Sequence, residues 1–334
     1  MDWSKGFSAS YRMTVVDPTT WRDTETINIT EGSIKREVSN LMESADVTCL
    51  NYPQRVERWV RIWLDGQQGA SSEHVPLFTG LAVSPDRELQ GTIERNPIEC
   101  YSVLKPAEDI LLERGWYAPV GFNGASLVKQ LLSVGPAPIV QEDFSPSLAS
   151  SIIAEDKETC LTMAQKILQS INWRLKISGN GTITICPKPQ ERIATFDSIE
   201  MDIIEPEVKV SYDWYSCPNV FRAIEDDLVG IARDDSPDSP LSTVSRGREI
   251  WAQDTNCDLS DNETVAEYAL RRLKEEQRKE LTVSYNRRFV PEIVPYDIVG
   301  LHLPAQNIEG SFIVQSQTIT LGYGAKASEE VVRA

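Results

Sequence analysis

One stretch, from about Asp261 to Leu321, limits the possible folds of this chain more than any other. Residues 262–277 have apolar side chains at helical spacing, and residues 280–285 alternate as a strand does. A proline-containing turn follows, and further strand segments lead to Leu321. One helix and a few strands cannot bury an apolar face by themselves, so the unit must pack on other parts of the chain. We predict that it closes a β-barrel within an assembly.

The helix expected over residues 262–277 has Asp261 or Asn262 as its N-cap, with acidic residues early and basic residues late, as the helix dipole favours. Arg272 is expected on its solvated face. We expect the apolar stripe to face inward across the barrel, partly against a neighbouring subunit. The stripe consists of Ala266, Ala269, Leu270 and Leu273.

Two further pairs in this stretch are predicted to be structural or to lie at a subunit interface. Arg287 and Arg288 follow the strand and are expected in a loop or at a subunit contact. Pro295 and Asp297 precede the next strand segment, and we expect them to shape the corner that leads into it.

The 334-residue chain is long enough for two or three domains, and its residue patterns suggest three. Residues 1–105 contain six or seven short alternating segments, which is typical of a small barrel or sandwich. Residues 106–190 change to helical spacing and end in a hairpin, which indicates a small inserted α/β domain. Residues 191–334 return to β and include the helix. The predicted fold is mainly β with α+β character, two β-barrel domains flanking a small α/β domain.

Two turns are expected within the first region. Glu31-Gly32 separates two alternating segments, and Asp65-Gly66 follows the strongest strand segment as a hairpin signal. The Trp59 and Trp63 side chains of that strand are expected to pack in the interior or at an interface.

The charge balance limits the partners of the chain. Asp and Glu number 50 against 33 Lys and Arg, which gives a net charge of −17. This balance argues against binding through nucleic acid phosphates or to an anionic membrane surface, because both need a basic face. Like charge does suit a surface past which DNA slides without adhering. No apolar run approaches the ~20 residues of a membrane span, and the N-terminus lacks the apolar segment of a signal peptide.

The sequence offers little for catalysis or metal binding. The six cysteines are scattered without a CxxC pair, which indicates buried thiols in a reducing cytoplasm rather than disulfides or structural zinc. The only histidines are His74 and His302, and the chain contains no nucleophile, phosphate-binding or dinucleotide motif. Acidic runs at 225–227 and 234–235 suit a cation or an acid/base pair, but solvated loops explain them better. We therefore predict no catalytic residue, cofactor site or metal site.

The order of these elements resembles the hub proteins of bacteriophage tails and baseplates, a family that includes the hubs of phages T4 and Mu and the late-control protein of P2-like phages. It is most similar to the short hubs of tailed phages and prophages. The resemblance covers nearly the whole chain and contains no catalytic motif. It depends on the segments at residues 172–185, 217–222, 266–273, 281–285, 294–301 and 310–316.

The resemblance implies a homotrimer whose protomers each contribute two barrels to a ring. Such a ring adapts a six-fold tail tube to a three-fold spike or tip, and DNA passes through its lumen without specific binding. The implied partners are the tube protein, the spike or tip protein, the C-terminus of the tape-measure protein and other baseplate proteins. The implied location is the virion tail, assembled in the host cytoplasm. No further domain is expected after about Ala327, so wall-digesting activity would belong to a separate chain.

Two alternatives remain open from the residues alone. One is a tail-associated cell-wall hydrolase, a peptidase or glycosidase, that uses carboxylates from Glu225, Asp226 or Asp227. The other is a carbohydrate-binding module for host recognition, suggested by eight tryptophans on a β scaffold, with Trp116 or Trp214 as the exposed aromatic residue.

Overall fold

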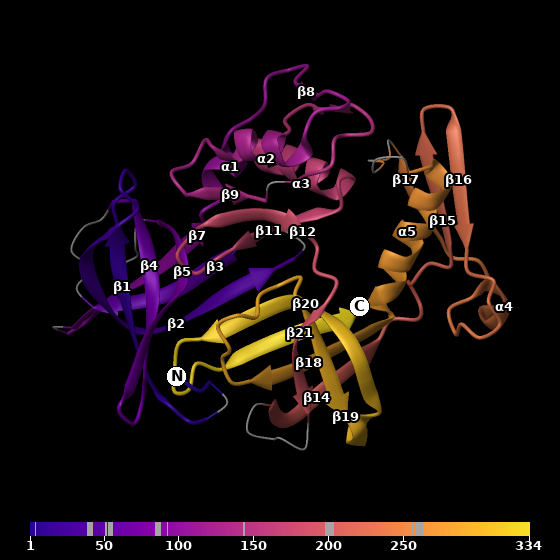
Figure 1. The fold of residues 1–334 in the computed structure, drawn as a ribbon. Coiled ribbons are helices and arrows are strands. Elements are labelled where there is room, and N and C mark those ends of the chain that lie inside the picture. The colour runs from indigo at the N-terminus through magenta and orange to yellow at the C-terminus, as the bar shows by residue number, and fades with distance from the viewer. Residues whose placement is uncertain are drawn as a thin grey trace.

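The protein is mainly β, as predicted, with several short helices (Figure 1). The computed structural model describes every residue except 4, 39–42, 51, 53–55, 84–87, 92, 143, 198–203, 256, 258 and 260–262. Figure 1 shows the main sheet below an α/β unit and a third unit that projects to one side. No helix in the described residues is long and apolar enough to cross a membrane.

Six strands near the N-terminus form a closed ring of backbone pairings. The order around the ring is β1-β4-β5-β7-β3-β2, and β2 pairs again with β1. Apolar side chains on alternating positions fill the interior, as expected for strands with one buried face. The strands are β1 (Ser8–Val16), β2 (Asp23–Glu37), β3 (Glu43–Leu50), β4 (Arg58–Gln68), β5 (Ser71–Ala82) and β7 (Ile93–Ser102), with β6 (Glu88–Gln90) beside β7.

Both turns predicted in this ring are wrong, because the glycines serve close packing. β2 continues through Gly32, where a Cβ atom would lie 2.6 Å from the carbonyl oxygen of Asp46 on β3. β4 continues through Gly66, where a Cβ atom would lie 2.6 Å from the Met1 side chain. The hairpin turn between β4 and β5 occurs instead at Gly69, whose φ of +58° suits glycine.

The expected α/β unit lies above this ring. Its helices cover the sheet β11-β12-β9 and share one hydrophobic core with it. The tip of its β11–β12 hairpin packs on β5, where Gly179 contacts the backbone of Pro76. The elements are α1 (Lys105–Asp109), β8 (Tyr117–Ala118), α2 (Gly124–Leu132), β9 (Ile139–Gln141), β10 (Ile152–Ile153), α3 (Cys160–Ser170), β11 (Trp173–Ile177) and β12 (Ile183–Pro187).

A second group of six strands continues the same sheet. It joins the first ring where β2 pairs with β20, from Ser33 opposite Thr320 to Glu37 opposite Ser316. Among the described residues, its pairing order β13-β19-β20-β21-β18-β14 does not close into a ring. The strands are β13 (Arg192–Asp197), β14 (Ile204–Tyr212), β18 (Leu281–Arg287), β19 (Ile298–Leu303), β20 (Ile308–Thr320) and β21 (Ala327–Arg333), with short 3-10 turns at Arg278–Glu280 and Pro304–Gln306.

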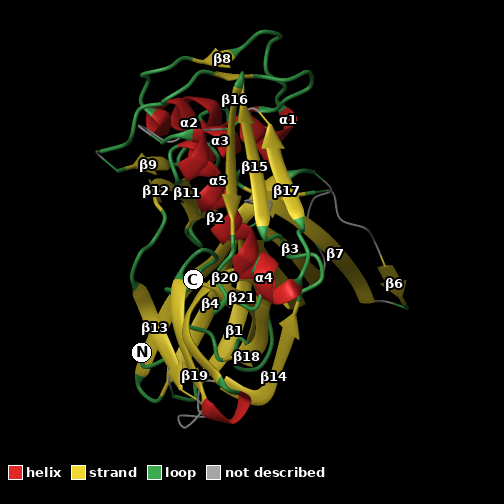
Figure 2. Ribbon diagram, turned by 90° about the vertical axis from the view of Figure 1, so that its right-hand side faces the viewer, coloured by secondary structure: helices red, strands yellow, loops and turns green. Residues whose placement is uncertain are grey.

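The predicted helix belongs to a separate small unit and does not lie across the second group of strands. It packs on the three-stranded sheet β16-β15-β17, with a hydrophobic core of its own (Figure 2). Its N-cap is Thr264, which forms a capping box with Glu267; the predicted caps Asp261 and Asn262 lie outside the described residues. The elements are β15 (Val220–Glu225), β16 (Leu228–Arg233), α4 (Thr243–Arg246), β17 (Trp251–Thr255) and α5 (Val265–Gln277).

Candidate functional site

Each histidine lies at the surface beside one acidic side chain. Nδ1 of His74 lies 2.6 Å from an Asp65 carboxylate oxygen on an exposed edge, and Nδ1 of His302 lies 3.9 Å from Glu309, also at the surface. In the described part of the chain, no group of three or more His, Cys, Asp or Glu side chains is placed to hold a metal ion.

The acidic runs stabilise loops. Asp226 has a φ of +49° at the tight turn between β15 and β16, next to Glu225. Burial raises the pKa of Glu225, and its Oε2 atom has no hydrogen bond within the described chain. Asp234 accepts hydrogen bonds from Ser239 and Gln277, which tie its loop to α5. Among the described residues, these carboxylates belong to no group of three or more acidic, His or Cys side chains that could hold a metal ion.

The cysteines and the tryptophans named above are buried, packed against other side chains or hydrogen-bonded within the protein. All six cysteines are buried, as predicted, and none forms a disulfide bond; burial raises the pKa of Cys49 to about 12. Trp116 packs against the core of the α/β unit. Trp214 is half exposed, and its indole N–H donates a hydrogen bond to Glu280. The side chain of Trp59 packs against Trp21, with 5.6 Å between the ring centroids.

The apolar face of α5 is rotated relative to the prediction. Leu273 and Ala269 are buried, but Ala266 is exposed and Leu270 is 44% exposed. The buried face is completed by Tyr268 and Val265, because the helix lies on the small sheet rather than across the second group of strands. The inward orientation predicted for Ala266 and Leu270 is therefore wrong. Tyr268 belongs to the core of this unit, and its hydroxyl donates a hydrogen bond to Asp254 of β17 at 2.9 Å.

Arg287 is the largest fully buried side chain of the protein among the described residues. It ends strand β18 and does not lie in the predicted loop. Its Nε donates to Glu329 Oε2 at 2.8 Å, and neither side chain is exposed. Tyr285 donates to the same carboxylate at 2.8 Å. Arg288 is only partly buried, and its backbone carbonyl accepts a hydrogen bond from Arg287.

This buried polar network continues into the first ring. Gln317 donates to Glu329 at 2.7 Å, and Arg36 donates to Gln317 at 3.0 Å. Arg36 also pairs with Glu43, Nε to Oε1 at 3.1 Å, and both side chains are buried. Burial raises the pKa of Glu43 to about 7, although Arg36 offsets part of the effect. The network therefore connects the interiors of the two groups of strands across the β2–β20 pairing.

The sequence prediction missed Glu329, although a signal was present. Glu329 has the same strand parity as Ala327 and Val331, both of which are buried in β21. Arg287 likewise continues the inward parity of β18. A charged residue at an inward position of an alternating strand predicts a buried ion pair.

The corner expected around Pro295 and Asp297 is also a joint between units. Asp297 accepts a hydrogen bond from the backbone N–H of Val294 at 3.0 Å, which closes the turn before β19. It pairs with Arg174 of β11 at 2.7 Å, and Arg174 also donates to the Pro295 carbonyl. Both charged side chains are buried. The turn thereby fixes the α/β unit to the C-terminal strands.

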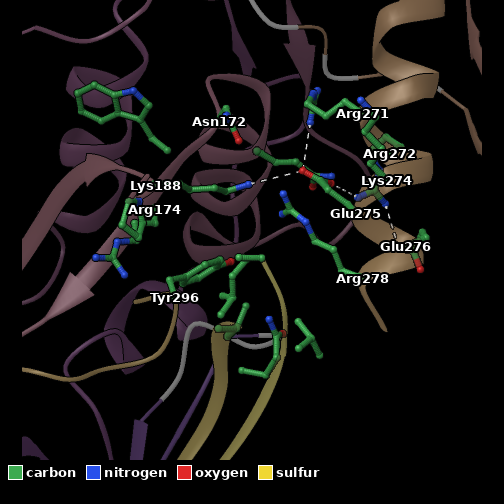
Figure 3. Close-up of a pocket in the computed structure, with 18 of the residues that line it drawn as sticks. Asn172, Arg174, Lys188, Arg271, Arg272, Lys274, Glu275, Glu276, Arg278 and Tyr296 are labelled. Atoms are coloured by element: carbon green, nitrogen blue, oxygen red, sulfur yellow. Dashed lines mark hydrogen bonds and ion pairs between the residues drawn. The ribbon is translucent and has the colours of Figure 1, made fainter. Parts of the chain in front are cut away.

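An open cleft of about 960 Å³ lies beside this joint, between the α/β unit, α5 and strands β19, β20 and β21 (Figure 3). Seven of the residues that line the cleft are Lys or Arg and three are Glu. Lys188 extends from the α/β side toward Glu275 of α5, with Nζ 3.9 Å from a carboxylate oxygen. The sequence prediction named Leu270 and Arg272 of this lining but not the cleft itself, because the lining comes from several stretches that are far apart in the chain.

Comparisons with known proteins identify the fold. No protein-family model matches this chain, and no curated protein does. The tail protein from Neisseria meningitidis MC58 has a similar structure, with a TM-score of 0.71, 14% identity, and coverage of 98% of this chain and 97% of that one. The 43 kDa tail protein of prophage MuSo2 from Shewanella oneidensis has a TM-score of 0.71 at 11% identity, with 98% of both chains covered.

A third similar structure is the prophage tail protein gp18 from Listeria monocytogenes EGD-e. Its TM-score is 0.59 at 13% identity, with 97% of this chain and 94% of that chain covered. The chain thus has a fold found in phage and prophage tail proteins, and the resemblance expected from the sequence is confirmed at the level of the fold.

Proposed function

We propose that this chain is a structural hub subunit in the tail or baseplate of a phage or phage-like particle. The observation that carries the proposal is the pairing of two six-stranded groups in one sheet, in a chain whose fold matches those of two tail proteins, one of them from a prophage, over nearly its whole length. The two groups have different sequences but similar size, so one protomer offers two β units side by side (Figure 1).

Three protomers around a three-fold axis would place six β units in a ring. Such a ring meets a six-fold tube on one side and a three-fold spike or tip on the other, because closed symmetry allows both. The proposed partners are the tube, spike or tip and tape-measure proteins and other baseplate proteins, and the proposed location is the virion. The net charge of −17 supports a lumen that DNA crosses without binding.

The buried polar network supports a mechanical role. A subunit that transmits force between a tube and a spike needs its two β units to keep a fixed relation. The network through Arg36, Gln317 and Glu329 crosses the boundary between them in the interior of the protein. Buried polar groups of this kind favour one arrangement over others, because any shift leaves a charge or an amide unpaired.

Two of the predicted interface residues expose apolar side chains. Ala266 and Leu270 lie on the outward side of α5, and we include them in a protein contact of the assembly. Arg287 and Asp297, by contrast, are buried within the protomer, so their proposed role is to hold its shape.

Mass photometry of the purified protein tests the ring. The expected result is a species of three times the 37.5 kDa of one chain, with three-fold rings in negative-stain electron micrographs. A protein that stays monomeric at micromolar concentration, and also fails to bind tail tube or spike proteins from the same genome, would refute the proposal. Assembly only in the presence of tube protein would support it, since hubs form on a template in that case.

A further inference from the structure

We propose that the cleft between α3, α5 and the C-terminal strands binds an acidic, partly apolar segment of a partner protein. The inference goes beyond the ring described above, because it concerns one protomer and does not depend on trimer formation. The cleft is open on one side, and 960 Å³ lies near the upper end of the range typical of ligand pockets, about 300–1,000 Å³. It therefore has room for several side chains of an inserted segment.

The cleft reverses the charge of the protein around it. The chain as a whole carries −17, whereas Lys and Arg outnumber Glu by seven to three in the cleft lining. Carboxylates outside the cleft lining neutralise part of this positive charge, since Arg271 pairs with Glu263 and Arg272 with Asp254. A local reversal of this kind selects for acidic partners and repels basic ones.

Three cations in the cleft lack a close carboxylate. Lys274 and Arg278 are exposed and make no ion pair in the part of the chain that the structure describes. Lys188 approaches only Glu275, at 3.9 Å, which exceeds hydrogen-bond distance. Figure 3 shows these side chains on opposite walls of one space, Lys188 on the α/β side and Lys274 and Arg278 on α5. A carboxylate placed between the walls would be within reach of both.

One buried donor also lacks an acceptor. The Nη1 atom of Arg271 is buried and makes no hydrogen bond within the described residues, and it lies 3.7 Å from Glu275. Buried donors without acceptors are uncommon, because leaving a donor unpaired away from water costs free energy. An acceptor supplied by a bound segment would remove that cost. Burial lowers the pKa of Lys188, and an anion nearby would reverse this shift.

Apolar surface in the cleft distinguishes a peptide from a small anion. Leu270 is 44% exposed on the α5 wall, and Pro189 and Tyr296 lie on the other walls, each partly exposed. Phosphate or sulfate would use the cations alone and leave these side chains uncovered. Recognition of acidic motifs by arginine clusters commonly combines charge with an apolar anchor, and this cleft offers both.

Binding of a fluorescein-labelled peptide of about 12 residues, composed of Glu, Asp and Leu, tests the inference by fluorescence anisotropy. The test variant is Lys274→Glu/Arg278→Glu, which changes two exposed side chains of the cleft. The matched control is Lys129→Glu/Lys209→Glu, which changes the net charge equally at exposed positions away from the cleft. Thermal melting of both variants establishes that they fold as the parent does.

The cleft variant should bind the peptide about tenfold or more weakly, whereas the control variant should lose much less affinity. Replacement of Leu by Ser in the peptide should also weaken binding. Equal loss in the two variants would overturn the inference, since binding would then follow net charge alone. Tighter binding of single-stranded DNA of matched length, lost in the cleft variant, would overturn it in favour of nucleic acid. Self-association abolished by the cleft variant would overturn it in favour of a second copy of this chain.

Discussion

The guanidinium of Arg287 and the carboxylate of Glu329 face each other between two adjacent strands, with neither side chain exposed to solvent. Glu329 also accepts hydrogen bonds from Tyr285 and Gln317, so its two oxygens are fully used. The pair lies opposite Phe196, whose ring centroid is 5.4 Å from the guanidinium carbon. A charge pair in such an apolar interior is stable only while both partners are present.

Glu329→Leu alone should therefore destabilise the protein by about 3–5 kcal/mol, because it leaves Arg287 buried without a counter-charge. The double variant Arg287→Met/Glu329→Leu should recover most of that loss. Urea denaturation of the parent, both single variants and the double variant measures the coupling. A double variant as unstable as the sum of the single variants would show that the two residues act independently.

The orientation of α5 can be tested with two leucines of equal size. Leu273→Ala should cost about 2–5 kcal/mol, because Leu273 is buried against the small sheet. Leu270→Ala should change stability by less than about 0.5 kcal/mol, because Leu270 is 44% exposed and lies outside the buried core of the helix and its sheet. Thermal denaturation monitored by circular dichroism compares the stabilities of the two variants with that of the parent. A larger effect at Leu270 would mean that the helix packs through its other face.

Glu43 should make the folded protein less stable as the pH rises, which is the opposite of the usual effect of a paired acidic side chain. Its carboxyl has a folded-state pKa of about 7, above its ordinary value, because burial outweighs the attraction of Arg36. The folded protein therefore holds this proton more tightly than the unfolded chain does. The stabilisation is complete below the ordinary pKa of a glutamate and is lost as pH rises toward 7, at about 1.4 kcal/mol per pH unit or less.

Chemical denaturation of the parent and of Glu43→Gln, at several pH values from about 4.5 to about 7.5, isolates this contribution. The difference in unfolding free energy between the two proteins should shift in favour of Glu43→Gln as the pH rises. A difference that stays constant across the range would show that the carboxyl ionises normally despite its burial.

The joint between the α/β unit and the C-terminal strands depends on Asp297. Asp297→Asn keeps an acceptor for the Val294 N–H but removes the charge that faces Arg174, whereas Asp297→Ala removes both. We expect faster amide exchange in β11 and in the turn for both variants, and more for Ala than for Asn. Hydrogen exchange with mass spectrometry measures the exchange rates of these amides, and the rates in β15–β17 serve as the internal control. Exchange that increases equally throughout would indicate global destabilisation rather than a loosened joint.

Local patterns alone predicted much of the fold. The alternating segments expected in residues 1–105 are strands such as β1 (Ser8–Val16), and the helical spacing expected in residues 106–190 corresponds to helices such as α2 (Gly124–Leu132). The mainly β class and the α/β insert followed from the same patterns. These features depend on neighbours in the chain, because a period of two or of 3.6 residues decides which side chains share a face.

The site was less predictable. The predicted stripe on α5 is correct at Ala269 and Leu273 but wrong at Ala266 and Leu270, because these two are as apolar as the residues that are actually buried. Only the position of the sheet β16-β15-β17 decides which face packs. The cleft was not predicted, since Lys188 and Arg278 come together only when two units fold beside each other.

The sequence by itself therefore determined the mainly β class, the α/β insert and the resemblance to tail proteins. The tertiary structure decided that Gly32 and Gly66 serve close contacts, that Arg287 is buried, and that Ile319 and Leu321 complete the core of the N-terminal ring. The physical reason is the sequence separation over which each kind of interaction acts. Periodicity and turn chemistry act over a few residues, whereas burial, pairing of charges and the shape of a cleft depend on segments that are hundreds of residues apart.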